Sequence, residues 1–346
     1  MIGQAAIGKV GPNPYKRRMD ATPTLPPQPA ILFVTATRIG DAVLSTGLLD
    51  HLVTRFPGAR ITVAAGMVAA PLFRGVPGLE GLIAMTKRKR AGHWFDLYRR
   101  VAGHRWDLVV DLRGSALSWL LWTRRRAMMA KGDSAEHRVR QLARLFRLDP
   151  PPPPKLWLTD KARTEAAALV PDCPFLAVGP TANWGGKQWP AERFAELLRR
   201  LTAPEGPFAG AKVAVLGAPH ERVQAEPVLT GLASGQVFDL IGKGDLLTAA
   251  AVAERARLYV GNDSGLMHIA AAVKTPTVGL FGPSREQEYA PWGPHCLVLR
   301  TPESHHELTT SATFDYRSAA TLMGGLSVET VFEGISSFAH RLELAA

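Results

Sequence analysis

Short apolar segments alternate with longer amphipathic segments along most of the chain. The first apolar run, 31–35, has the length and flanking residues of a strand buried in a parallel sheet. Apolar residues at helical spacing follow it as far as Phe56, and Pro57-Gly58 ends that predicted helix. Another strand is predicted over 61–65. The folded part of the chain therefore begins as strand, helix, strand.

The same alternation continues through most of the remaining sequence. Further strands are predicted over 108–112, 175–179, 212–217, 237–241, 258–260 and 277–281. Helices are predicted over 191–201, 246–255 and 266–273. Alternating strands and helices form parallel sheets with helices on both faces, so the fold class is α/β. Five prolines at 150–154 exclude helix and stiffen the chain there, which favours two domains joined near this point.

Composition narrows the class of protein. The chain has 346 residues, 46% of them hydrophobic and 21% charged, which excludes a wholly disordered protein. Its two cysteines exclude a disulfide scaffold and a cysteine-based zinc site, and they favour a reducing compartment. No apolar stretch has the length of a membrane span or a signal core, so we expect a cytoplasmic protein. The proline-rich residues 1–29 are predicted to form a flexible tail.

The positive charge is concentrated in the first half of the chain. The net charge is +11. Residues 1–175 hold 27 Lys+Arg and 13 Asp+Glu, a net of +14, whereas residues 176–346 hold 14 and 17, a net of −3. This division suggests that one half meets an anionic partner. Nucleic acid, an anionic membrane and a phosphorylated substrate all fit the charge alone.

An acidic side chain follows the first predicted strand. In the segment 37–41, Gly40 permits a tight turn and Asp41 lies at or near the start of the next helix. Ligands of parallel α/β sheets bind at the carboxyl ends of strands. Two interpretations stay open from spacing alone. Asp41 caps the helix, or its carboxylate faces the cleft between the domains and takes a proton from an attacking hydroxyl.

Two further segments after strands have features of a phosphate site. The glycine-rich loop 179–190 carries Lys187 shortly before a helix, which suits a phosphate contact, although an exposed loop lysine is the alternative. The segment 260–272 places Ser264 at the start of a helix of small residues, where free backbone N–H groups suit a diphosphate. His268 lies one turn into that helix, either as a structural residue or facing the cleft.

Basic and aromatic residues gather in two segments of the first half. They are Lys87, Arg88, Lys89, Arg90, Trp119, Trp122, Arg124, Arg125 and Arg126. One interpretation is a solvated charge run together with a core helix flanked by charge. The other is a surface that rests on anionic lipid headgroups, with tryptophans at the interface. No motif or fold signal for nucleic acid binding accompanies them, so we expect no nucleic acid partner.

The segments 31–49, 179–197 and 259–284 together resemble glycosyltransferase family 9, the heptosyltransferases of lipopolysaccharide core assembly. The resemblance extends over about residues 31–340 and includes the ending LSVETVFEGI, 326–335. It implies a GT-B fold of two Rossmann-like domains facing a cleft. Its parts are a flexible tail (1–29), an acceptor-binding domain (30–154), a nucleotide-sugar-binding domain (155–325) and a helix packing back toward the first domain (326–346).

The resemblance also implies a reaction. This is an inverting, metal-independent transfer of heptose from ADP-heptose to an anionic lipid A–core acceptor, without a cofactor, at the cytoplasmic face of the inner membrane. Two departures leave the acceptor and the sugar open: segment 299–325 lacks the cysteines of many relatives, and the proline-rich leader is not a family feature. The alternatives are a transferase of the same fold with another nucleotide-sugar, and a non-catalytic nucleotide- or membrane-binding relative.

Site residues follow from the resemblance position by position. Asp41 matches the catalytic base, and Lys187 matches the lysine that contacts the donor phosphates. The turn that holds the diphosphate and the sugar matches Asp263, Ser264, Gly265 and Leu266, with His268 beside it. Glu221 is expected to bind ribose hydroxyls, and Thr181 is a looser match to a phosphate contact. No metal-binding residues are predicted.

Overall fold

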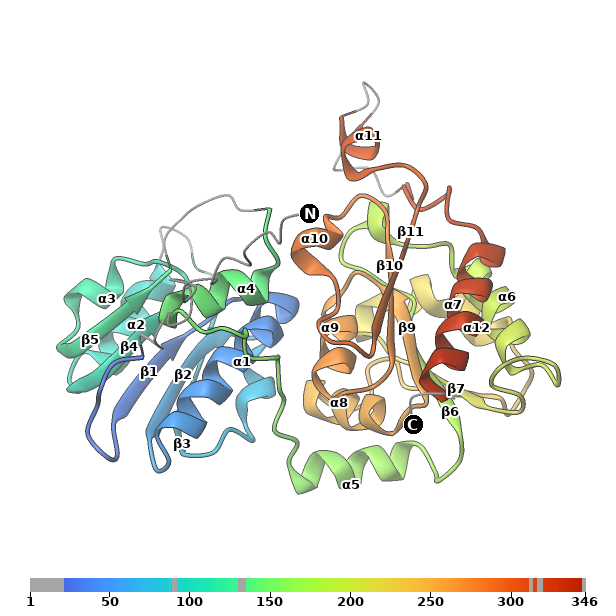
Figure 1. The fold of residues 1–346 in the computed structure, drawn as a ribbon. Helices are drawn as coiled ribbons and strands as arrows, with labels where there is room; N and C mark the ends of the chain where they lie inside the picture. Colours follow the sequence, from blue (N-terminus) through green and yellow to red (C-terminus); the bar gives the residue numbers. More distant parts are fainter. Residues whose placement is uncertain are drawn as a thin grey trace, which may run out of the picture.

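The computed structural model describes residues 22–86, 88, 92–129, 135–310, 314–315 and 320–343. It contains two sheets, one in each half of the chain (Figure 1). The chain passes from one half to the other through 150–159, which form no helix or strand. All strand pairings in both sheets are parallel. The predicted α/β class with two parallel sheets is confirmed.

The first sheet has five strands in the order β3-β2-β1-β4-β5. They are β1 (Ala30–Val34), β2 (Arg60–Gly66), β3 (Leu79–Met85), β4 (Trp106–Asp111) and β5 (Thr123–Met128). The central strand β1 is buried along its whole length, because separate apolar clusters cover the two faces of the sheet. The sequence predicted β1, β2 and β4 but not the two edge strands.

Helices cover both faces of this sheet. They are α1 (Ile39–Arg55), η1 (Ala70–Phe73), α2 (Gly92–Val101), α3 (Leu117–Leu120), α4 (Arg138–Ala143) and η3 (Arg144–Phe146). Helix α1 packs on one face through residues such as Val43 and Leu48. Helices α2 and α3 pack on the other face through Leu97 and Leu117.

The predicted tail, 1–29, divides into two parts. Residues 1–21 lie outside the described residues. Residues 22–29 form no helix or strand, yet Leu25 packs against the core of the first half. The Thr22 hydroxyl also lies 2.8 Å from Nε2 of His51, in a hydrogen bond to helix α1. The end of the predicted tail is thus attached to the first domain.

The second sheet has six strands in the order β11-β10-β9-β6-β7-β8. They are β6 (Phe175–Gly179), β7 (Lys212–Val215), β8 (Val237–Asp239), β9 (Leu258–Asn262), β10 (Thr277–Phe281) and β11 (Cys296–Arg300). The sequence predicted β6 to β10, and missed the edge strand β11. The surrounding elements are α5 (Asp160–Leu169), η4 (Gly185–Lys187), α6 (Ala191–Thr202), η5 (Pro219–Glu221), α7 (Arg222–Thr230), α8 (Leu246–Arg255), α9 (Gly265–Ala272), α10 (Glu286–Tyr289), α11 (His305–Thr309) and α12 (Val328–Glu343).

The last helix, α12, does not return to the first domain, so that prediction for 326–346 is wrong. Its apolar face, including Ile335 and Phe338, joins the core cluster of the second sheet, and the helix contacts α6 and β11 (Figure 1). The Arg200 guanidinium also donates a 2.8 Å hydrogen bond to Glu329. Burial of this face against the nearer domain therefore determines where the helix packs.

The two domains meet where α1 packs against α9. A Cβ on Gly265 would lie 2.6 Å from Cγ2 of Ile39, so only glycine permits this approach. The proline run is held along α1 as well, since a Cβ on Gly47 would lie 2.3 Å from the carbonyl oxygen of Pro152. Within the described ranges, no helix combines the length and the apolar composition needed to cross a bilayer.

Candidate active site

Asp41 lies in the first turn of α1. The residue before the helix is Arg38, which has extended backbone angles and provides no capping side-chain hydrogen bond. None of the described residues donates a hydrogen bond to the Asp41 carboxylate. The charge of Asp41 suits the positive end of the helix dipole. Because none of these residues occupies the carboxylate, it is available to accept a proton from a bound molecule.

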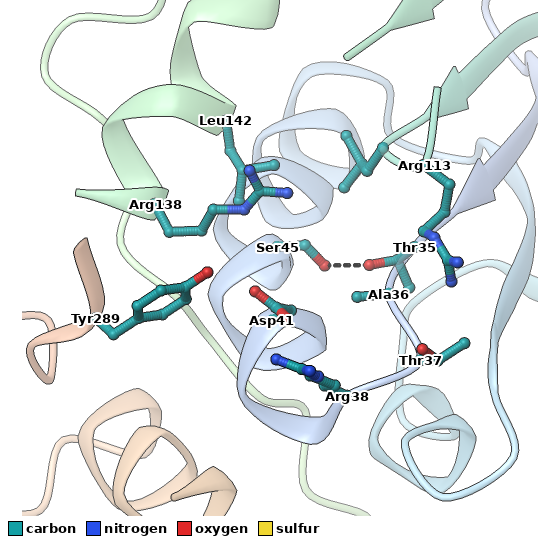
Figure 2. Close-up of a pocket in the computed structure, with 11 residues that line it drawn as sticks. Thr35, Ala36, Thr37, Arg38, Asp41, Ser45, Arg113, Arg138, Leu142 and Tyr289 are labelled. Carbon is teal, nitrogen blue, oxygen red and sulfur yellow. Dashed lines mark hydrogen bonds between the residues drawn. The ribbon is translucent and has the colours of Figure 1, made fainter. Parts of the chain in front are cut away.

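A cavity of about 340 Å³ opens beside Asp41 (Figure 2). Three arginines line it, Arg38, Arg113 and Arg138, together with Tyr289 of α10. The Nε atom of Arg138 is buried and has no hydrogen-bond partner among the described residues. Arginine side chains are suited to binding carboxylate or phosphate oxygens. The sequence did not predict any of these four residues as part of the site.

The position of Arg113 depends on the buried carboxylate of Asp111, the last residue of β4. One oxygen of Asp111 accepts a 2.9 Å hydrogen bond from the backbone N–H of Arg113. The other accepts bonds from the backbone and hydroxyl of Ser115, at 2.9 and 2.6 Å, and from the hydroxyl of Ser118 at 2.9 Å. Asp111 therefore shapes the loop that presents Arg113 to the cavity.

Lys187 and Asp263 meet at the carboxyl ends of β6 and β9. The Lys187 ammonium donates a 2.5 Å hydrogen bond to Oδ2 of Asp263, which is only 7% exposed. The fully buried Asn262 ties the two segments together. Its side-chain N–H bonds the carbonyl of Pro180 at 2.8 Å, and its oxygen accepts from the N–H of Trp189 at 3.0 Å. The pairing explains why an acidic residue lies in a predicted phosphate site: it fixes the lysine.

Thr181 and Glu221 also lie together. The Thr181 hydroxyl donates a 3.0 Å hydrogen bond to Oε2 of Glu221, and the same oxygen accepts a 2.7 Å bond from the N–H of Ala218. Thr181 is buried, and Glu221 is half-buried. In this arrangement Thr181 holds the Glu221 carboxylate in place. The phosphate contact of Thr181 and the ribose contact of Glu221 stay predictions.

The turn 263–266 begins helix α9. Ser264 takes the N-cap position in extended conformation, and its side chain makes no capping hydrogen bond within the described structure. The first backbone N–H groups of α9, from Gly265 and Leu266 onward, have no acceptor within the helix because they precede its first turn of hydrogen bonds. This is the geometry that binds diphosphates at helix N-termini.

His268 is 4% exposed and lies against the start of α1. A Cβ on Gly40 would lie 2.8 Å from Cδ2 of His268, so glycine is required there by this close approach. Gly40 has no positive φ, and the tight turn that its position suggested is not the reason for it. Burial lowers the pKa of His268 to about 4, so the imidazole is neutral at pH 7. Its buried Nδ1 atom has no partner among the described residues.

Most of the described basic and aromatic side chains predicted for a membrane surface are exposed to solvent. Trp119 and Trp122 are 68% and 64% exposed, and α3 is a single turn. Arg124, Arg125 and Arg126 belong to the edge strand β5 and are also exposed. The two tryptophans therefore face solvent, whereas Leu117 and Leu121 of the same segment are buried in the core. Lys87, Lys89 and Arg90 lie outside the described residues, whereas Arg88 forms a 2.9 Å ion pair with Asp96.

Comparison with solved structures identifies the class of protein that this fold defines. The structure of Escherichia coli ADP-heptose LPS heptosyltransferase II has a TM-score of 0.72 at 21% identity, covering 91% of this chain and 99% of that one. The structure of Escherichia coli heptosyltransferase WaaC with ADP has a TM-score of 0.68 at 19% identity, covering 89% and 99%. The fold is therefore the GT-B fold.

The chain belongs to glycosyltransferase family 9 (heptosyltransferase), whose family model matches residues 102–315. Lipopolysaccharide heptosyltransferase 2 of Salmonella typhimurium is 24% identical, over 82% of this chain and 91% of its own length. The predicted family and the prediction of an enzyme are both confirmed. In the described part of the chain, His, Cys, Asp and Glu side chains do not gather in threes as a metal site.

Proposed function

We propose that this enzyme transfers heptose from ADP-heptose to an anionic, lipid-linked acceptor of the lipopolysaccharide core, by inversion and without a metal. The observation that carries the proposal is the carboxylate of Asp41, which accepts no hydrogen bond from the described residues and lies in an arginine-lined cavity next to the contact between α1 and α9. The similar Escherichia coli heptosyltransferase WaaC binds ADP in its structure, which supports an adenosine diphosphate donor for this enzyme. The other similar protein is an ADP-heptose LPS heptosyltransferase, which supports heptose as the transferred sugar.

The chemistry divides between the two domains. Asp41 accepts the proton of the acceptor hydroxyl while the acceptor oxygen attacks the anomeric carbon of the heptose. The bond from that carbon to the diphosphate breaks, and its electron pair leaves with ADP. Lys187 and the backbone N–H groups at the start of α9 stabilise the departing negative charge. Lys187 has three N–H bonds, so it can keep its bond to Asp263 and still donate to a phosphate oxygen.

The acceptor is proposed to bind from the side of the first domain. Arg38, Arg113 and Arg138 surround the cavity, and their charge suits an acceptor that carries carboxylate or phosphate groups. The same domain holds the net positive half of the sequence. The second domain, which is proposed to bind the donor, lies in the half of the chain with net negative charge. This is compatible with binding a diphosphate, because the proposed phosphate contacts come from one lysine and from backbone N–H groups.

A lipid-linked acceptor requires the enzyme to work at a membrane surface. Exposed apolar side chains gather on and beside α2 and α3, namely Phe95, Trp119, Leu120 and Trp122. Together with Arg88, Arg124 and Arg125 they form what we term the basic-aromatic surface. It adjoins the cavity, because the loop that carries Arg113 leads directly into α3. We propose that this surface rests on anionic lipid at the cytoplasmic face of the inner membrane.

Vesicle binding tests this surface. The variant Arg124→Gln/Arg125→Gln should bind phosphatidylserine vesicles about 30-fold more weakly, since each basic residue near the surface contributes about 1 kcal/mol. ADP binding, measured by calorimetry, should not change. Val223→Ala provides a matched control, because Val223 is 85% exposed on α7 of the second domain. Equal vesicle binding by the charge variant and the wild type would contradict the proposed surface.

The donor and reaction are tested directly with a panel of nucleotide sugars. We expect ADP-heptose to bind in calorimetry and to support transfer to extracted core acceptor, whereas UDP- and GDP-sugars should do neither. If only a uridine donor bound tightly, the donor would be another nucleotide-sugar and not ADP-heptose. Binding without any product, with every donor, would contradict the proposed transferase activity.

A further inference from the structure

One wall of the cavity beside Asp41 comes from the second domain. Ten of the eleven residues that line the cavity belong to the segment 35–142, and the other is Tyr289, the last residue of α10. In Figure 2 the side chains of Tyr289 and Arg138 extend toward Asp41. No described residue hydrogen-bonds the Tyr289 hydroxyl. Burial and the negative charge of Asp41 raise the pKa of Tyr289, so it is a neutral hydrogen-bond donor at pH 7.

A contact between the two domains holds the residue next to Tyr289. Nε2 of His137 lies 2.9 Å from the carbonyl oxygen of Ala290. The imidazole also lies against Trp292, with 4.6 Å between ring centroids. We call His137, Ala290 and Trp292 the clasp. The other ring nitrogen of His137 accepts a 3.2 Å hydrogen bond from the N–H of Val139, so Nε2 carries the proton and donates to Ala290.

The clasp and the cavity share one helix. His137 is the N-cap of α4, and Arg138, whose buried Nε has no partner among the described residues, is the next residue. Arg138 follows the clasp residue His137 in the first domain, and Tyr289 precedes the clasp residue Ala290 in the second domain. Both side chains line the cavity. Each presents a hydrogen-bond donor that the described protein does not satisfy. Asp41 is proposed to take a proton from one hydroxyl of the acceptor. The two donors beside it are therefore suited to bind a second oxygen of the same acceptor.

We propose that Tyr289 is a positioning residue for the acceptor, and that the clasp holds it in place. Tyr289 and Arg138 donate hydrogen bonds to one acceptor oxygen, and this orients the neighbouring hydroxyl toward Asp41. The donor domain thereby takes part in acceptor recognition, since the acceptor site is complete only while the clasp is formed. The inference rests on the proposed transferase function and adds a residue that family resemblance and sequence spacing do not indicate.

Kinetics of Tyr289→Phe test the hydroxyl. A neutral hydrogen bond is worth about 1 kcal/mol, so the KM for acceptor should rise by about 5- to 10-fold. The kcat should change by less than about threefold and ADP affinity should not change. Tyr98→Phe is the matched control, because Tyr98 is a partly buried tyrosine in α2, away from the cavity. An unchanged acceptor KM in Tyr289→Phe would overturn the proposal while leaving the transferase function intact.

The clasp is tested through His137→Asn. Asparagine can still accept the bond from Val139, but it loses the contacts with Ala290 and Trp292. We expect an acceptor KM raised about fivefold. In the Tyr289→Phe background the same change should cost less than about twofold, because the clasp acts through Tyr289. If the increases in acceptor KM were fully additive in the double variant, the proposed role of the clasp would be overturned. If the wild-type enzyme showed no sugar transfer, the proposed function and this inference would both be overturned.

Discussion

Asp41→Asn should lose about 10³-fold in kcat while ADP binds with unchanged affinity. The substitution keeps the size and polarity of the side chain but removes its ability to take a proton, and general base catalysis contributes about 10²- to 10⁴-fold. Asp41 accepts no hydrogen bond from the described residues, so the variant leaves no buried donor unsatisfied and the fold should be unaffected. Steady-state kinetics and calorimetry with ADP measure the two quantities.

Asp50→Asn is a matched control for this prediction. Asp50 lies near the other end of α1 and accepts a 2.9 Å hydrogen bond from Lys155 at the surface. Exposed ion pairs contribute little to stability, and Asp50 does not line the cavity. Its variant should therefore transfer sugar at close to the wild-type rate. Transfer by Asp41→Asn at a similar rate would remove Asp41 as the base.

The interior of both sheets could be predicted from the sequence because it is apolar on both faces. Strands β1, β6, β9 and β10 are buried along their whole length, and each reads as a short apolar run. The edge strand β5 has the sequence TRRRAM, with three exposed arginines. These arginines interrupt the apolar pattern, so the sequence predicted a charged segment there and not a strand.

The predicted catalytic and donor-binding residues share one property, since each follows a strand by a few residues. Asp41, Lys187 and the turn at Asp263 follow β1, β6 and β9, and parallel strands bring their carboxyl ends to one edge of a sheet. Arg138 and Tyr289 lie at helix ends, since one begins α4 and the other ends α10, and no motif in the sequence marks them. Their meeting in one cavity depends on how the domains pack, which periodicity along a single chain does not encode.

The sequence pattern also does not predict which domain the last helix, α12, packs against. The amphipathic pattern of 328–343 predicts a buried face, and Val331, Ile335 and Phe338 form that face as expected. It does not say which domain covers the face. The indole N–H of Trp189 donates a 2.8 Å hydrogen bond to the carbonyl of Leu326, which ties the segment before α12 to the second domain. The amphipathic pattern of α12 would suit packing against either domain. This contact, between residues more than a hundred positions apart, favours the second domain.

Lys187→Met should reduce ADP affinity by about 10- to 100-fold and kcat/KM for the donor by about 10²- to 10³-fold. A hydrogen bond to a charged group is worth about 1.5–3 kcal/mol, and a donor aimed at developing negative charge contributes more in the transition state. The variant also leaves the nearly buried carboxylate of Asp263 without its lysine. Its melting temperature should therefore fall as well, in a thermal unfolding experiment.

The double variant Lys187→Met/Asp263→Asn separates the lost phosphate contact from the lost stability. A neutral amide at position 263 removes the unpaired charge, so the melting temperature should recover most of its loss. Donor affinity should stay low, because the positive charge is still absent. Lys161→Met serves as the control, since Lys161 lies on α5 of the same domain and pairs with Glu165 at the surface, 3.7 Å away. If donor affinity returned with stability in the double variant, Lys187 would act on the fold and not on the phosphates.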